Sequence, residues 1–129
     1  MGQQQLLLIV LGVIIVGIAI VVGINLFQSS AVDANRNAVI QDLNTLASKA
    51  QEYYKKPTSL GGGGNSFLGF VTPTGLASNA NGTYTLTATA ANVVIVGTGT
   101  ETGNDGSAKV KATATVTAAS QQPAVVINN

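Results

Sequence analysis

Residues 6–27 read LLLIVLGVIIVGIAIVVGINLF, and this apolar run decides the fold of the chain. From Leu6 to Ile24 the run contains no charged and no polar side chain. Nineteen residues at about 1.5 Å of rise per residue make a helix of roughly 28 Å, close to the ~30 Å hydrocarbon core of a bilayer. Because a helix that is apolar on every side is unstable at a protein–water surface, the run must be covered by lipid or by other protein.

The small residues of this run are compatible with close contact between two helices. At about 100° per residue, Gly12, Ala19 and Gly23 fall on one face, and Ala19 and Gly23 form a small-xxx-small pair, whereas Gly17 points elsewhere. The run is interpreted either as a single membrane anchor or as an assembly helix that leaves the membrane and packs in a polymer core. In the second interpretation, the residues expected in that core are Leu6, Leu7, Leu8, Gly12, Gly17, Ala19 and Gly23.

The composition of the chain argues against several classes of function. The 129 residues carry a net charge of +1, and the six Lys and Arg residues are scattered, which leaves no basic patch for nucleic acid. Cysteine and histidine are absent, so the chain lacks thiolates, the usual general base and the commonest metal ligand. No two carboxylates have the spacing of an acid–base pair. We therefore expect a protein that is not an enzyme and that takes no cofactor, metal or small-molecule substrate.

Helical periodicity continues beyond the apolar run into residues 28–56. No proline interrupts the helical pattern until Pro57, which follows two lysines that suit a helix C-terminus. The sequence predicts one helix from about Gln3 to Lys56, whose first part (residues 1–27) is apolar on all sides and whose second part is amphipathic. The apolar stripe of the second part is expected to form the interface between helix and sheet; it contains Val32, Val39, Leu43, Leu46, Ala47, Ala50 and Tyr54.

Arg36 interrupts this stripe, because it lies near the face that carries Val32 and Leu43. One interpretation is a side chain that extends along the surface or pairs with Asp33 at the i,i+3 spacing. The other interpretation is a contact with an acidic side chain of a neighbouring subunit. The sequence leaves both interpretations open.

Residues 57–82 are predicted to be a glycine-rich loop region. Its four consecutive glycines, Gly61 to Gly64, are interpreted as a flexible connector. Asn81-Gly82-Thr83 is an N-x-S/T sequence at a turn, so Asn81 is either a plain turn residue or a glycosylation site. Apolar residues between these two features are expected to pack back onto the helix stripe: Phe67, Leu68, Phe70 and Val71.

From residue 83 to residue 129 the period of the pattern changes to two, which indicates an antiparallel sheet. Apolar residues alternate with threonines from residue 83 to 90, and with lysines and threonines from 108 to 117. A continuous apolar strand at 93–96 lies between these segments, and a short fourth strand is predicted at 124–127. Gly103-Asn104-Asp105-Gly106 is predicted to be the hairpin turn. Glu101, Asn104 and Asp105 are too few ligands for a good calcium site, which favours a plain turn.

The complete layout predicts the α+β class, with a long N-terminal helix packed against a small antiparallel sheet of about four strands. This layout resembles that of type IV pilins and of the wider pilin superfamily, which includes pseudopilins and archaeal pilins and flagellins. The resemblance implies insertion in the cytoplasmic membrane, extraction by an assembly machine, and polymerisation with identical copies into a filament on the cell surface. The fifth position, acidic in typical bacterial pilins, is Gln5 here, or Leu7 if a leader ends at Gly2.

Two other functions are kept as alternatives to a filament subunit. A membrane-anchored β-module that does not polymerise differs only in the final location of residues 6–27. A filamentous virion coat subunit also has a long helix with an apolar middle, but such coats place a basic segment against the genome, whereas this chain ends in Val125-Val126-Ile127-Asn128-Asn129. Nucleic acid is therefore not an expected partner.

Overall fold

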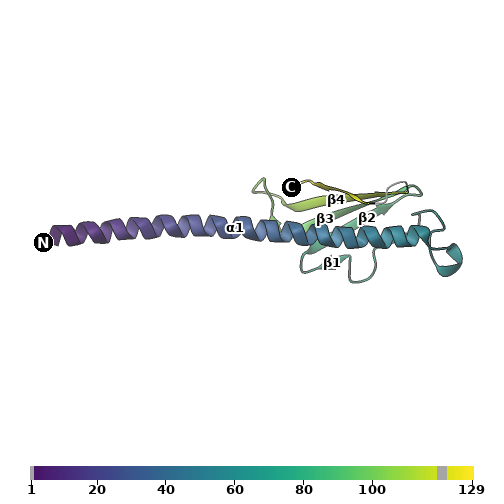
Figure 1. The fold of residues 1–129 in the computed structure, drawn as a ribbon, viewed down its shortest axis with the longest axis horizontal. Helices are drawn as coiled ribbons and strands as arrows, with labels where there is room; N and C mark the ends of the chain where they lie inside the picture. The colour runs from purple at the N-terminus through teal and green to yellow at the C-terminus, as the bar shows by residue number, and fades with distance from the viewer. Residues whose placement is uncertain (1, 119–121) are drawn as a thin grey trace. The chain divides into compact units, whose positions relative to one another are not determined.

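The computed structural model describes residues 2–118 and 122–129. The helix α1 (Gly2–Lys55) comes first, followed by the short 3-10 helix η1 (Thr58–Leu60). The strands follow as β1 (Ser78–Asn79), β2 (Gly82–Ala88), β3 (Asn92–Thr102), β4 (Lys109–Thr117) and β5 (Ala124–Ile127) (Figure 1). The α+β class is thereby confirmed. The chain divides into two compact units, of which the first ends at Ala31 and the second begins at Val32, and each is described by itself.

The bounds of α1 agree with the predicted helix to within one residue at each end. The helix stops at Lys55, two residues before Pro57, because proline lacks an N–H group and disfavours helical geometry in the residue that precedes it. Pro57 itself has an extended backbone conformation, with φ −62° and ψ 150°.

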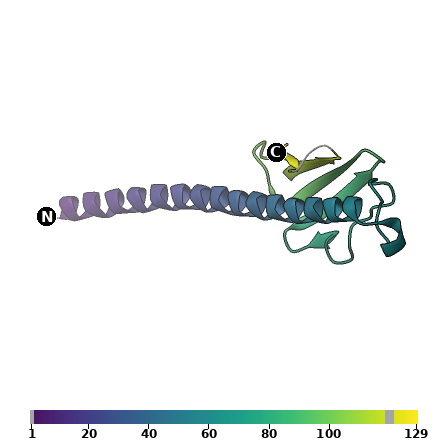
Figure 2. The ribbon, with the colours of Figure 1, turned by 45° about the vertical axis from the view of Figure 1, so that its right-hand side comes forward.

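The five strands form one antiparallel sheet in which every strand pairs with its neighbour in the sequence, in the order β1-β2-β3-β4-β5 (Figure 2). The expected four strands are all present, and Gly103 to Gly106 lie in the hairpin between β3 and β4. The prediction of a loop was wrong for β1, where Ser78 pairs with Thr83 and Asn79 with Gly82. The reason is the two-residue turn Ala80-Asn81, which folds Ser78 and Asn79 back onto the start of β2.

The core of the second unit lies between one face of the sheet and the C-terminal half of α1. The alternation of buried and exposed residues along β3 and β4 places Val93, Ile95, Ala112 and Ala114 on the helix side, together with residues from β2. The alanines of β4 allow the helix to approach closely. Two glycines of β3 also face the helix closely, because a Cβ on Gly97 would lie 2.8 Å from Cγ1 of Val39, and a Cβ on Gly99 would overlap Oδ1 of Asn35.

The four-glycine segment is not the flexible connector that the sequence predicted. Its backbone N–H groups cap the end of α1: Gly63 donates to the Tyr53 carbonyl at 2.8 Å, and Gly64 donates to the Lys56 carbonyl at 3.0 Å. A Cβ on Gly63 would lie 1.8 Å from the Ser66 carbonyl oxygen. The glycines therefore permit a tight backbone fold that satisfies helix carbonyls otherwise left without partners.

The aromatic residues that follow the glycines close the core at the end of α1. The ring of Phe67 packs 4.6 Å from that of Tyr54, and the ring of Phe70 lies 5.4 Å from that of Tyr53. The expected packing of Leu68 and Val71 was wrong, since these side chains are 65% and 74% exposed. Leu68 points outward because it occupies a central position of the turn closed by the hydrogen bond from Phe70 N–H to the Phe67 carbonyl.

Candidate functional site

The largest uncovered feature of the first unit is the apolar surface of residues 6–27. Every Leu, Ile, Val and Phe side chain from Leu6 to Phe27 is at least 50% exposed. This part of α1 is long and apolar enough to cross a membrane, and no residue of its most apolar window is buried. Because so much contiguous apolar surface is costly in water, it needs a cover from outside the single chain.

The small residues predicted to mediate helix packing lie on this surface. No atom from outside the local helix lies within 4 Å of a Cβ built on Gly12, Gly17 or Gly23, and Ala19 is exposed. The side chains of Leu6, Leu7 and Leu8 are exposed as well. A second helix is therefore not obstructed at any of these positions within the described part of the chain.

The residues predicted for the helix–sheet interface lie in the second unit, and five of the seven are fully enclosed. Val39, Leu43, Leu46, Ala47 and Ala50 are buried in the core. Val32 is half-buried, and Tyr54 is a half-buried side chain that packs against the core edge. These side chains pack within the second unit, so they are not part of the uncovered apolar surface.

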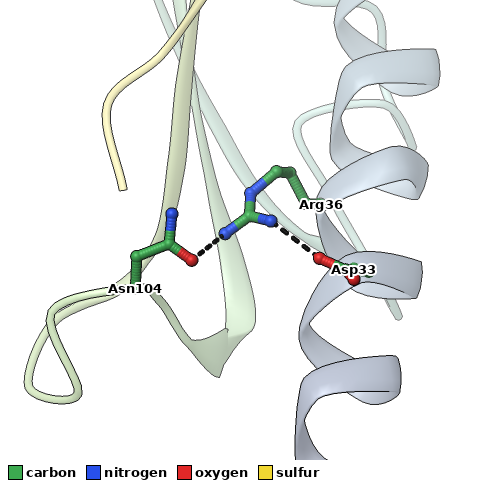
Figure 3. A network of polar contacts seen from close by, with 3 residues as sticks. All are labelled: Asp33, Arg36 and Asn104. Carbon is green, nitrogen blue, oxygen red and sulfur yellow. Dashed lines mark hydrogen bonds and ion pairs between the residues drawn. The ribbon is translucent and has the colours of Figure 1, made fainter.

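Arg36 joins α1 to the hairpin between β3 and β4 (Figure 3). Its Nη1 donates to Oδ1 of Asp33 at 2.9 Å, and its Nη2 donates to Oδ1 of Asn104 at 2.7 Å. The Arg36 side chain is only 12% exposed, and its Nε is buried without a partner among the described residues. The i,i+3 pair with Asp33 is thus present, and a contact with another subunit stays a prediction.

Asn35 makes structural contacts that the sequence did not predict. Its Oδ1 accepts hydrogen bonds from the backbone N–H groups of Thr100 and Glu101 at 3.1 and 3.3 Å, and its Nδ2 donates to the Asn81 carbonyl. Those two N–H groups lie where the pairing of β3 with β4 shifts register. The signal in the sequence was that Asn35, a polar residue, has the spacing of the apolar stripe of the helix: it lies three residues after Val32 and four before Val39.

Asp42 is the second residue whose contacts the sequence did not predict, and these contacts hold the turn that carries Asn81. Its Oδ2 accepts hydrogen bonds from the Tyr84 hydroxyl at 2.5 Å, from Asn79 Nδ2 at 2.9 Å and from Asn81 Nδ2 at 3.0 Å. Nδ2 is the atom to which an N-linked glycan is attached. A glycan replaces only one of the two hydrogens on this nitrogen, so the remaining N–H group can still donate to Asp42, and the bond is compatible with either interpretation of Asn81.

The same contacts set the acidity of both groups. Partial burial acts to raise the pKa of Asp42, but the hydrogen bonds from Tyr84, Asn81 and Asn79 together hold it below its ordinary value of 3.8. Burial is also the largest cause of the raised pKa of the Tyr84 phenol, and the hydrogen bond and charge of Asp42 raise it further. Asp42 is therefore ionised and Tyr84 protonated at neutral pH.

Acid is expected to weaken the second unit through Asp42. Because its folded-state pKa is depressed, the carboxylate contributes stability that is present above its unfolded pKa of 3.8 and is lost as the pH falls through the folded value. The free energy of unfolding of Asp42→Asn should therefore lie below that of the parent at about pH 6 and approach it at about pH 3. Glu101→Gln, which removes an exposed carboxylate, is the control. A gap that stays constant with pH would contradict this account.

The hairpin acids form a turn and gather no further ligands. Oδ1 of Asp105 accepts hydrogen bonds from the N–H groups of Ser107 and Ala108, both at 2.9 Å, and from Nδ2 of Asn129 at 3.1 Å. These bonds lower the pKa of Asp105. Among residues 2–118 and 122–129, no group of three or more His, Cys, Asp or Glu side chains has the arrangement of a metal site.

The candidate site is therefore the apolar surface of residues 6–27, while the polar contacts of Arg36, Asn35 and Asp42 hold the second unit together. The chemistry of this surface is association with other apolar groups, whether acyl chains or side chains. In comparisons with known proteins, no protein-family model, curated protein or solved structure matches the chain.

Proposed function

We propose that the chain is a structural subunit of a helical filament on the cell surface and has no enzymatic activity. The observation that carries the proposal is the exposed apolar surface of residues 6–27, on a helix whose C-terminal half is the core element of a folded unit. A polymer covers the apolar surface with copies of itself and leaves the second unit in water. This layout also supports the resemblance to type IV pilins.

The free energy of covering this surface is compatible with a subunit that is first inserted in the membrane and then assembled into the filament. Covering it from water, at ~25 cal/mol per Å² of apolar area, contributes on the order of tens of kcal/mol before ordering costs. Relative to lipid the gain is much smaller, because acyl chains already cover the same side chains. The subunit therefore resides in the membrane before assembly, its extraction needs work from an assembly machine, and its loss from a filament into water is slow.

The register between subunits is set by helix packing in this proposal. There is no acidic side chain within the first turns of α1, so a salt bridge to a carboxylate there is unavailable to fix the register. Gly12, Ala19 and Gly23 provide a face at which two helices approach closely. Gln3, Gln4 and Gln5 add neutral hydrogen bonds at the end of the bundle.

The test is a substitution that fills the small-residue face. Ala19→Leu and Gly12→Leu should abolish filaments or change their helical rise, because the added side chain separates the packed helices. Ile20→Leu, which keeps the volume and lies on another face, is the control and should leave the rise unchanged. The measurement is electron microscopy of filaments sheared from cells that express the full chain. Normal filaments of unchanged rise from both Leu variants would contradict the proposed packing.

The main alternative is a membrane anchor that never polymerises, since a bilayer covers the same surface equally well. It predicts that the chain stays in the membrane fraction after shearing and that no fibre contains it. Recovery of the chain in sheared filaments excludes this alternative, and its complete retention in membranes excludes the filament.

A further inference from the structure

We propose that the outer edge of β5 is a self-association site, which pairs in antiparallel fashion with β5 of a second copy of the chain. The two edges of the sheet differ in their construction. The β1 edge is two residues long, and its Asn79 side chain is bound to Asp42. The β5 edge is four residues long and lies at the end of the strand order. The inference does not depend on the proposed filament, because it concerns the second unit alone.

The chemistry of the β5 edge favours a second copy as its partner. Val126 and Ile127 are 57% and 50% exposed, and no charged residue occurs in the sequence after Lys111. Proteins usually protect an open edge with charged side chains, bulges or a covering segment. An open edge binds another extended strand through backbone groups, and two uncharged β5 strands do not repel each other.

The backbone of β5 alternates between its two sides, and one hydrogen bond fixes which residues face outward. Asn128 continues the β4–β5 register opposite Lys111, and its N–H group donates to the Lys111 carbonyl at 2.8 Å. The N–H group of Asn129, which lies beyond the regular pairing, donates to the same carbonyl at 3.1 Å. Because these groups reverse direction with each residue of a strand, Ala124 and Val126 also direct their N–H and C=O groups toward β4. The N–H and C=O groups of Val125 and Ile127 therefore point to the open edge.

This alternation of backbone groups along β5 selects one register for the pairing of two β5 strands. When two copies are related by a two-fold axis perpendicular to the sheet, residues on the same face lie opposite each other. With Val126 of both copies on the axis, Val125 of each copy faces Ile127 of the other, and both such pairs exchange two backbone hydrogen bonds. The exposed side chains of Val126 and Ile127 then gain β-branched cross-strand neighbours.

The two neighbouring registers are less favourable. An axis at Val125 places Ile127 opposite Pro123 of the second copy, and proline has no N–H group to donate. An axis at Ile127 places Val125 opposite Asn129, whose backbone N–H and carbonyl groups are already bonded to Lys111 at 3.1 and 3.4 Å. The register centred on Val126 avoids both problems.

A single cysteine tests this register, because the chain contains no cysteine of its own. In the full-length protein in detergent, Val126→Cys should form a disulfide-linked dimer under mild oxidation. Opposed residues in an antiparallel pair have Cα atoms about 4.5–5.5 Å apart, within the range that a disulfide spans. Val71→Cys is the matched control, since this valine is 74% exposed and lies outside the sheet. We expect the linked fraction of Val126→Cys to exceed that of the control about tenfold, because distant cysteines meet only by collision.

A charge exchange provides the second test. Val126→Lys and Val126→Glu should each abolish the dimer, since like charges then lie opposite each other on the axis, and an equimolar mixture of the two should restore it. Thermal unfolding of each variant verifies that the second unit remains folded. Equal linking of Val126→Cys and Val71→Cys, or folded charge variants that fail to pair in the mixture, would overturn the proposal. Loss of linking in Ala19→Leu together with Gly12→Leu would instead assign the association to α1.

Discussion

Leu43→Ala is expected to lower the free energy of unfolding of the second unit by about 2–5 kcal/mol. Leu43 is fully buried, on the face of α1 that packs against the sheet. Its truncation removes apolar contacts and leaves a cavity between two elements that are each held by other contacts, so the site cannot collapse freely. For a domain of this size, such a loss is a large fraction of the total stability.

Tyrosine fluorescence is a selective measurement for this prediction. The chain has three tyrosines and no tryptophan, and Tyr53, Tyr54 and Tyr84 all lie in the second unit. Denaturant unfolding of the full chain in detergent, followed by this signal, reports the stability of that unit. Leu68→Ala is the control, because the exposed Leu68 side chain should contribute less than about 0.5 kcal/mol. Equal losses for the two variants would show that the packing around Leu43 is not as described.

Gly63→Ala is expected to cost about 2–4 kcal/mol, although it adds one methyl group. The new Cβ would lie 1.8 Å from the Ser66 carbonyl oxygen and 2.8 Å from Cε1 of Tyr53. The backbone must move to relieve this overlap, which breaks the hydrogen bond from Gly63 N–H to the Tyr53 carbonyl. The end of α1 then loses part of its cap.

Gly61→Ala separates this effect from the general cost of replacing a glycine. Gly61 has φ +82°, but no atom lies within 4 Å of a Cβ placed there. Only the strain of a left-handed backbone remains, about 1–2 kcal/mol. The same fluorescence measurement compares the two variants. If Gly61→Ala were as destabilising as Gly63→Ala, the overlap with the Ser66 carbonyl oxygen would not explain why residue 63 must be glycine.

Patterns within one element were sufficient to predict most of the fold. The helix, the four longer strands and the hairpin at residues 103–106 follow from periodicity, from Pro57 and from turn residues, which act over a few positions. The same reasoning could not distinguish Phe67 from Leu68, because both are apolar and adjacent. Their different exposure results from a turn whose orientation depends on the end of α1.

Contacts between distant residues were the part that the sequence could not give. Arg36 and Asn104 are 68 positions apart, and Asp42 and Tyr84 are 42 apart, so no local pattern connects them. The four glycines also have the composition of a linker, and their role as a cap depends on the carbonyls of Tyr53 and Lys56. The apolar run shows that a cover is needed, but hydropathy is the same for lipid and for a neighbouring helix, so its partner stays a prediction.

The strand order has a consequence for how the second unit forms. Since β1 to β5 are arranged in space as they are in the chain, each hairpin closes over a short separation and no segment has to be threaded between others. The main contacts between segments far apart in the sequence form when the sheet docks on α1, a helix whose own hydrogen bonds are local. A newly made chain can therefore form its sheet by pairing neighbouring strands one after another, and the docking of this sheet on α1 is the remaining long-range step.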